Sequence, residues 1–366
     1  MPTSKPDEVP TLGICYLKGI KLKPAHITKK DDDDRESLEH ILPNALGGRL
    51  KSRFILSHGA NRKLNEEIDK EFVKTFESFT NQLALSKDRK TSPSMRATHL
   101  DYNKDVIFKD GRYFPKKPFY DVTKKIVYAD SIKSAENYFK YLINRGEISA
   151  DEDIELHDDI AGPLTIPFSP KNNSFKRGFA KIAIGYATLQ GISRNKLDLA
   201  LDTKDNKILD KIILLPSIPT NFSDKYFEEH VHTGQNYPCH TLTLCGSQGI
   251  LYCHVELFST FHWYVVLSEQ YEGKDIYRTY TYDLINDKEI TREEYLSSIS
   301  LSDELPPIQE HRKLGIAHYM RLRNQGCPKH IVDKYNHDKF HRLSRFVNMR
   351  FIYNKAIKLG KIVLQE

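Results

Sequence analysis

The spacing of apolar residues changes character within the first 85 positions of the chain. LEHIL, residues 38–42, has the length and composition of a short strand, and RFILS, residues 53–57, is predicted to be its antiparallel partner. Gly47-Gly48 favours a turn between them. From Asn61 onward, apolar residues recur at helical spacing and predict one amphipathic helix; they are Leu64, Ile68, Phe72, Phe76, Phe79 and Leu83. The pattern therefore predicts strand, loop, strand and helix in that order.

The rest of the chain alternates between strand-like and helix-like segments. A helix is predicted over residues 174–191, with Ser174 as its N-cap and Gly191 just after its end. The last region, from about residue 304, is typical of helices interrupted at NQGCP. Five segments rich in β-branched and aromatic residues predict strands, namely 211–219, 240–245, 249–258, 262–268 and 277–284. We therefore predict an α+β fold built on an antiparallel sheet.

The length of 366 residues is enough for two or three domains. Changes in composition predict an N-terminal domain, then a linker or peripheral segment rich in Pro, Gly and Lys, then a larger α+β domain, and finally a helical C-terminal region. The predicted boundaries are 1–90, 91–117, 118–303 and 304–366.

The overall composition excludes several classes of protein. Hydrophobic residues make up 39% of the chain, so a core can form and global disorder is not expected. No run of about 18 apolar residues predicts a membrane span, and the N-terminal residues lack the apolar stretch of a secretory signal. The five irregularly spaced cysteines favour a reducing compartment over a disulfide framework. We therefore expect a cytoplasmic protein that does not act at a membrane.

Positive charge is concentrated near the C-terminus. Residues 311–361 hold 13 Lys and Arg residues against two acidic ones, a net charge of +11, whereas the whole chain carries only +6. Aromatic residues lie between these bases. The segment is therefore a candidate surface for nucleic acid, although a solvated helix with buried aromatic residues would have the same composition.

One short stretch points to a reaction. Glu39 and His40 lie on the first predicted strand, and Asn61 opens the predicted helix. A neutral imidazole can take a proton from water near pH 7. Mg²⁺ prefers oxygen ligands and keeps several waters, so one carboxylate and one amide oxygen can hold it. We also expect the first turn of the helix to offer N–H groups to a phosphate. These residues together predict hydrolysis of a phosphodiester, whereas each alone has an ordinary structural explanation.

The segments EHILPNALGG and SHGANRKLNEEID resemble the motif of HNH endonucleases, the ββα-metal or His-Me finger nucleases. The resemblance covers about residues 12 to 75 and implies that residues 1–90 form an HNH nuclease domain. It implies that His40 is the general base and that Glu39 and Asn61 bind one catalytic Mg²⁺ or Mn²⁺. Many members have an Asn that orients the base, and Ser52 stands at that position here.

The chain departs from the family in its zinc site. The similar subgroup carries two Cys-x-x-Cys pairs that bind a structural zinc. The corresponding residues here are Cys15, Lys18, Ser57 and Ala60, and a single thiol cannot hold tetrahedral zinc. We therefore expect no structural zinc. Another group of His and Cys residues lies between 230 and 262, but its spacing matches no zinc motif, so we interpret it as buried cysteines with assorted polar histidines.

Basic residues flank the predicted nuclease site and are candidates for contacts with phosphates; they are Arg49, Lys51, Arg53, Arg62 and Lys63. We therefore hypothesise a metal-dependent endonuclease acting on DNA rather than RNA, with a C-terminal part that recognises the substrate, a protein partner or a second copy of the chain. Multidomain bacterial HNH proteins often serve restriction or phage defence, and this context is carried over by analogy alone. The alternative is a non-catalytic nucleic-acid-binding or sensor protein built on a degenerate HNH scaffold.

Overall fold

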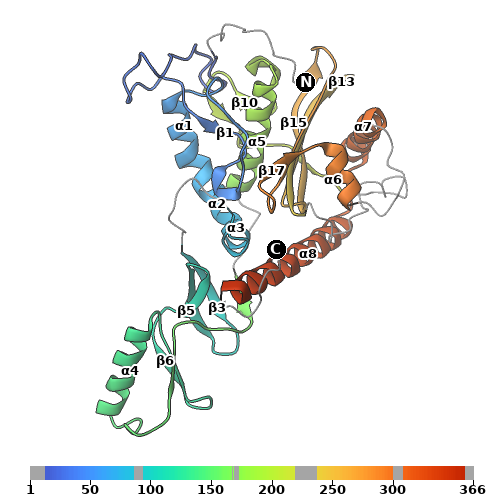
Figure 1. Cartoon of the computed structure of the whole chain (residues 1–366). Coiled ribbons are helices and arrows are strands. Elements are labelled where there is room, and N and C mark those ends of the chain that lie inside the picture. Colours follow the sequence, from blue (N-terminus) through green and yellow to red (C-terminus); the bar gives the residue numbers. More distant parts are fainter. Residues whose placement is uncertain are drawn as a thin grey trace, which may run out of the picture. The chain divides into compact units, whose positions relative to one another are not determined.

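The computed structural model describes residues 13–85, 94–166, 168, 173–218, 237–299 and 308–358. Helices and mostly antiparallel sheets are mixed along the chain, which confirms the predicted α+β class (Figure 1). The chain divides into two compact units, and each is built from segments that are distant in sequence. The first unit combines Met1–Thr75 with Pro170–Phe346, and the second combines Phe76–Ser169 with Val347–Glu366.

The first unit begins with a small hairpin followed by helices. Strands β1 (Glu39–His40) and β2 (Lys51–Ser52) are antiparallel and enclose the 3₁₀ turn η1 (Asn44–Leu46). Helix α1 (His58–Leu64) follows, so the predicted order of strand, loop, strand and helix is confirmed. The helical stretch then continues through a π-helical turn η2 (Asn65–Asp69), α2 (Lys70–Thr75) and, in the second unit, α3 (Glu77–Gln82).

Two details of this prediction are wrong. The partner of β1 is Lys51–Ser52 rather than residues 53–57, because the latter bond elsewhere: the carbonyl of Ile55 accepts from Tyr16 N and that of Leu56 accepts from Ser37 N. The helix is also not continuous, since the backbone leaves helical geometry at Phe76. The predicted apolar stripe is nevertheless buried at every position; its members are Leu64, Ile68, Phe72, Phe76, Phe79 and Leu83.

Helix α5 (Asn173–Leu189) is the central helix of the first unit and is buried along most of its length. It packs against α2 on one side and against the large sheet on the other. At Gly178 a Cβ atom would lie only 2.1 Å from the ring of Phe72, so glycine lets the two helices approach closely. Ser174 lies inside α5, so the N-cap prediction is wrong, whereas Gly191, with φ +85°, follows the end of the helix as predicted.

The large sheet has six antiparallel strands in the order β12-β15-β14-β13-β16-β17. Its strands are β12 (Leu214–Pro216), β13 (Cys239–Ser247), β14 (Gly249–Leu257), β15 (Phe261–Tyr271), β16 (Ile276–Asp283) and β17 (Lys288–Ile290). The five predicted strands are confirmed as β12 to β16. A two-stranded ladder of β10 (Leu201–Asp202) and β11 (Lys207–Ile208) and the 3₁₀ turn η3 (Arg194–Lys196) connect α5 to this sheet.

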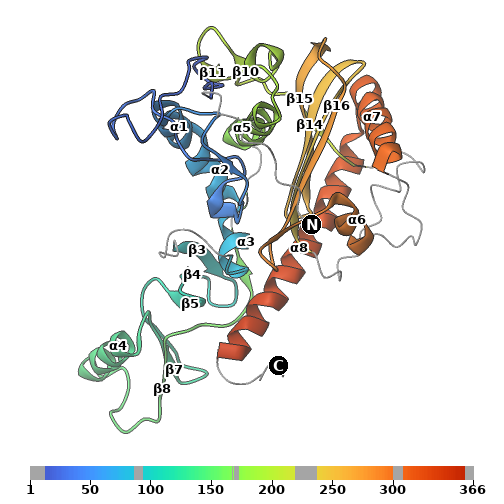
Figure 2. The same ribbon diagram turned by 45° about the horizontal axis from the view of Figure 1, so that its top comes forward.

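Helices cover both faces of the large sheet, with α5 on one side and α6 (Arg292–Ile299) and α7 (Ile308–Gln325) on the other (Figures 1 and 2). Tyr319 and Leu322 of α7 pack against Tyr252 and Tyr264 of the sheet. Helix α8 (Lys329–Lys358) follows a break at Gly326, as predicted, and its residues up to Phe346 belong to the first unit.

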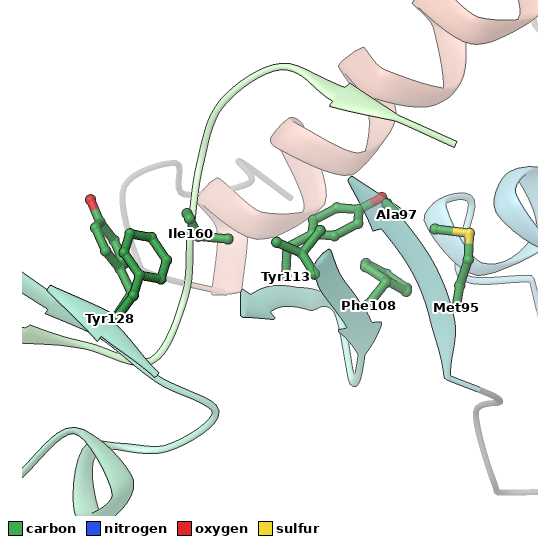
Figure 3. Close-up of a cluster of buried hydrophobic side chains, with 8 residues drawn as sticks. Met95, Ala97, Phe108, Tyr113, Tyr128 and Ile160 are labelled. Carbon is green, nitrogen blue, oxygen red and sulfur yellow. The ribbon is translucent and has the colours of Figure 1, made fainter. Parts of the chain in front are cut away.

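The second unit contains two smaller sheets. Strands β5-β4-β3-β9 form one and β6-β7-β8 form the other, with α4 (Ile132–Asn144) packed on β7 and β8. Figure 3 shows the core, in which Phe108 and Tyr113 belong to neighbouring strands; Phe351 of α8 packs on both rings. The strand bounds are β3 (Met95–His99), β4 (Lys104–Lys109), β5 (Arg112–Pro115), β6 (Phe119–Asp121), β7 (Ile126–Tyr128), β8 (Glu155–His157) and β9 (Leu164–Thr165).

The two units divide the chain differently from the predicted boundaries at residues 90, 117 and 303. The hairpin and the large sheet share one unit because α5 packs against both α2 and the sheet. Residues 94–117 carry strands β3 to β5, so they are not a linker; β4 and β5 form an antiparallel hairpin, which agrees with the other alternative, a peripheral segment. Residues 86–93 lie outside the described part.

None of the helices in the described part of the chain has the length and apolar character required to cross a membrane.

Candidate functional site

The β1–β2 hairpin brings four of the predicted site residues into register. Glu39 lies opposite Ser52, and His40 lies opposite Lys51. The connection between the strands closes at Gly47, which has φ +85° and would strain any other residue. Because side chains alternate along a strand, Glu39 and Ser52 share one face, and His40 and Lys51 share the other. Glu39 and Ser52 are buried, whereas His40 is half-buried and Lys51 is exposed.

The carboxylate of Glu39 lies in a buried ion pair that the sequence did not predict. Its Oε1 atom is 2.8 Å from Nζ of Lys181 on α5, and the same ammonium is 2.5 Å from Oδ2 of Asp69. The Lys181 and Glu39 side chains are only 5% and 4% exposed, so solvent screens this interaction little. One ammonium therefore serves two carboxylates.

The pKa shifts of Glu39 and Lys181 follow from this arrangement of one ammonium and two carboxylates. Burial raises the pKa of Glu39 above its usual value, Lys181 opposes that rise, and Asp69 adds to it. Burial alone would lower the pKa of Lys181, but the two carboxylates outweigh burial, and the pKa of Lys181 is raised. Lys181 therefore keeps its positive charge. Its ammonium pairs with one of the two carboxylate oxygens of Glu39, the predicted metal ligand.

Ser52 has a local structural contact. Its Oγ atom accepts a hydrogen bond from the backbone N–H of Phe54, 3.1 Å away, at the turn that follows β2. The register places Ser52 opposite Glu39 and on the face away from His40. Its predicted role in orienting the base stays a prediction.

Asn61 is the fourth residue of α1, which begins at His58, so the prediction that Asn61 opens the helix is wrong. Its side chain is tied to the segment that enters β1. Its Nδ2 atom donates to Oγ of Ser37 over 2.8 Å, and Ser37 stands two residues before Glu39. Since the nitrogen is used for this hydrogen bond, the amide oxygen is the atom of Asn61 left for a cation. Asn61 is half-buried, so solvent reaches it.

The first turn of α1 does not offer its N–H groups to a phosphate, which corrects that expectation. The N–H of His58 donates to the Arg35 carbonyl, 2.7 Å away, and that of Gly59 donates to the Asp33 carbonyl, 2.9 Å away. The N–H of Ala60 is 3.4 Å from Oγ of Ser57, the N-cap. These contacts fix α1 against the residues that precede β1.

Two turns stand where the HNH subgroup has its zinc-binding cysteine pairs. In the first, the N–H of Lys18 is 3.4 Å from Sγ of Cys15. In the second, Ser57 Oγ takes the equivalent place as acceptor for Ala60. Lys18 also pairs with Asp34 through its ammonium, at 3.3 Å. The local turn geometry is therefore supported by hydrogen bonds and burial in place of thiolate ligands.

The five basic residues near the hairpin differ in what they contact. Arg49 pairs with Asp287 at 3.2 Å, and Arg62 pairs with Asp33 at 3.1 Å. Lys63 Nζ is 3.5 Å from the carbonyl of Asn206, and Lys51 and Arg53 are exposed on β2 and in the residue after it. Their role in binding nucleic acid stays a prediction.

The histidines and cysteines of the large sheet largely follow the interpretation from sequence. Cys239, Cys245 and Cys253 are buried. His240 is buried as well, with Nε2 2.9 Å from the carbonyl of Leu46. His230 and His232 lie outside the described residues. His254 and His262 differ from the rest, since they meet Glu256, a residue that the sequence interpretation did not consider.

Lys181 was also missed, although the sequence carries a signal for it. The lysine interrupts an otherwise apolar helical stretch, GFAKIAIGYA, in which all the neighbouring residues are buried. A lysine that is buried on all sides is almost always paired. This position could therefore have been flagged, although its partner could not.

Comparisons with protein-family models, curated proteins and solved structures find no match to this chain. The likeness to HNH endonucleases therefore rests on the motif residues themselves.

Proposed function

We propose that the hairpin and α1 form the active site of a metal-dependent HNH-type endonuclease that hydrolyses phosphodiester bonds in DNA. The observation that carries the proposal is the pairing of half-buried His40 with exposed Lys51 on one face of the hairpin, followed by a helix that presents Asn61. The remaining residues of the chain would recognise the substrate or regulate cleavage, as expected for a restriction or phage-defence effector.

In this proposal His40 removes a proton from the attacking water, which requires its neutral form. Lys51, opposite His40, is positioned to attract the negatively charged backbone of the substrate. When bound, Mg²⁺ or Mn²⁺ would neutralise charge on the phosphate and the leaving oxygen.

The residues fit such a cation in part. Asn61 offers an amide oxygen, which suits a hard cation that keeps most of its waters. Glu39 shares its carboxylate with Lys181, so only the oxygen that does not face the ammonium remains for a metal. Asn61 is therefore proposed as the direct ligand, with Glu39 contributing through its second oxygen.

The decisive experiment is a plasmid-nicking assay with Mg²⁺ or Mn²⁺. We expect His40→Ala to slow nicking by about 10²- to 10⁴-fold, the range for loss of a general base. His58→Ala is the matched control, because His58 is a half-buried histidine of the same segment and the backbone hydrogen bond of its N–H survives the change. Equal nicking by wild type and His40→Ala would contradict the proposal.

The alternative, a non-catalytic nucleic-acid-binding or sensor protein on a degenerate HNH scaffold, is favoured by one specific observation. An ammonium lies 2.8 Å from the carboxylate that the family uses for its metal. In that case wild type would bind DNA without nicking it under any divalent cation. His40→Ala would then bind as wild type does.

A further inference from the structure

A second group of candidate ligands lies in the same unit on the large sheet. His254 and Glu256 are two residues apart on β14 and therefore point to the same face. His262 on β15 lies directly opposite Glu256 in the register. The side chains of Tyr252 and Tyr264 point to this same face of the sheet, and both pack against α7. The face is therefore the one that α6 and α7 cover.

The three side chains converge. One possible ligand atom from each lies within 4.8 Å of the other two. Nδ1 of His262 is 3.7 Å from Oε2 of Glu256, and the two imidazole rings have centroids 5.9 Å apart. All three are largely withdrawn from solvent, with side-chain exposures of 9% for His262 and 3% for Glu256.

The kind of donor decides which cation would suit this group. Two imidazole nitrogens and one carboxylate oxygen suit Zn²⁺, Mn²⁺, Fe²⁺ or Co²⁺, whereas Mg²⁺ and Ca²⁺ prefer oxygen ligands alone. Metal–ligand bonds of about 2.0–2.2 Å bring ligand atoms within roughly 4 Å of each other. Small rotations of the three side chains would meet that requirement.

We propose that His254, Glu256 and His262 bind one divalent transition-metal ion. This site is independent of the proposed nuclease site, because it uses different strands and different donor chemistry. It would give the part of the chain beyond the hairpin a ligand of its own.

Charged and polar side chains from two helices surround the carboxylate of Glu256. Arg292 on α6 has Nη1 3.6 Å from Oε2 of Glu256, and Tyr295 donates a hydrogen bond to Oε1 of the same carboxylate. Lys339 on α8 is buried, and its charge acts on both His254 and Glu256.

The test uses the full chain loaded with Co²⁺ or Zn²⁺, freed of excess metal by gel filtration and analysed for metal content. We expect wild type to retain one ion and His254→Ala to lose it. Glu256→Gln is the second variant, because glutamine keeps the acceptor for Tyr295 while removing the charged ligand. Both should weaken binding by at least the roughly 10- to 100-fold that loss of an outer-shell partner costs.

Two controls separate this site from others. His337 and His341 form an exposed pair on α8, with Nε2 atoms 3.0 Å apart, and their double alanine variant should retain the ion. Asn61→Ala removes a proposed ligand of the nuclease site and should also retain it. Failure of wild type to retain either Co²⁺ or Zn²⁺, or equal retention by Glu256→Gln, would overturn the metal site.

Discussion

Glu39 and Glu256 are both buried carboxylates on strands of the first unit, but their neighbours differ. Glu39 faces the ammonium of Lys181, which it shares with Asp69. Glu256 lies beside His262, accepts a hydrogen bond from Tyr295 and is 3.6 Å from Arg292. The motif drew attention to Glu39, whereas the donor set suited to a transition metal surrounds Glu256. A local motif specifies residue types, but the tertiary neighbours decide what a carboxylate can bind.

The largest effect should come from removing the ammonium beside Glu39. Lys181→Met leaves two carboxylates buried without their cation, and breaking a buried pair in this way costs about 3–5 kcal/mol. We expect the free energy of unfolding, measured by urea denaturation in metal-free buffer, to fall by that amount. The reason is that Glu39 and the half-buried Asp69 would each have to stay charged without a partner or take up a proton.

Lys176→Met is the control for this prediction. Lys176 is exposed on the same helix, so its replacement should leave stability close to that of wild type. If Lys181→Met were as stable as this control, Glu39 would not depend on Lys181, and the contrast with Glu256 would disappear.

His240 on β13 connects the two regions and should give the next largest effect, through pH. Its Nε2–H donates to the carbonyl of Leu46 in the hairpin loop, and its Nδ1 accepts from the N–H of Phe258, two residues beyond Glu256. Burial lowers the pKa of His240 to about 4, although the hydrogen bond to Leu46 opposes this. The ring is therefore neutral in the folded protein at physiological pH.

The direction in which stability changes with pH follows from the lowered pKa of His240. Below pH 6.5 the unfolded chain takes up a proton at His240, and the folded chain does so only near pH 4. The stability that His240 contributes is therefore present above pH 6.5 and is lost on acidification, by about 3 kcal/mol between those values. The difference in unfolding free energy between wild type and His240→Gln should therefore become smaller as the pH falls from 6.5 to 4. A gap that stays constant from pH 7 to 4 would contradict this assignment.

Much of the fold was predictable because it is encoded locally. The strands β13 and β14 follow from their composition and from the turn at Gln248 and Gly249, which have φ of 53° and 81°. The stripe from Leu64 to Leu83 is buried as its period requires. The order of the sheet was not predictable, since β12 pairs with β15 across a long separation in sequence.

The candidate sites also combine features that the local sequence predicts with contacts that it does not. The order of hairpin and helix follows from the local sequence, although β2 begins two residues earlier than predicted and α1 begins at His58 rather than at Asn61. Once β2 is placed, its register opposes His40 to Lys51. The ion pair of Lys181 with Asp69 joins residues 112 apart, and the approach of His262 to Glu256 depends on the pairing of two strands. Contacts of this kind depend on tertiary packing, which no short window of sequence contains.

The smallest effect should come from Arg49, which makes a second and more exposed connection between the hairpin and the large sheet. Arg49 extends from the hairpin to Asp287 at the turn between β16 and β17, and the two side chains are 26% and 52% exposed. An exposed pair contributes about 0.2–1 kcal/mol, because solvent screens the charges and two flexible side chains must be held in place. We expect Arg49→Ala to lower the unfolding free energy by that amount in low salt, and 1 M NaCl to reduce the difference from wild type. Lys51→Ala, an exposed position on the same hairpin, should show no such loss. If Arg49→Ala lost as much unfolding free energy as Lys181→Met, the Arg49–Asp287 pair would stabilise the hairpin as much as the buried Lys181–Glu39 pair does. Burial would then not determine how much an ion pair contributes here.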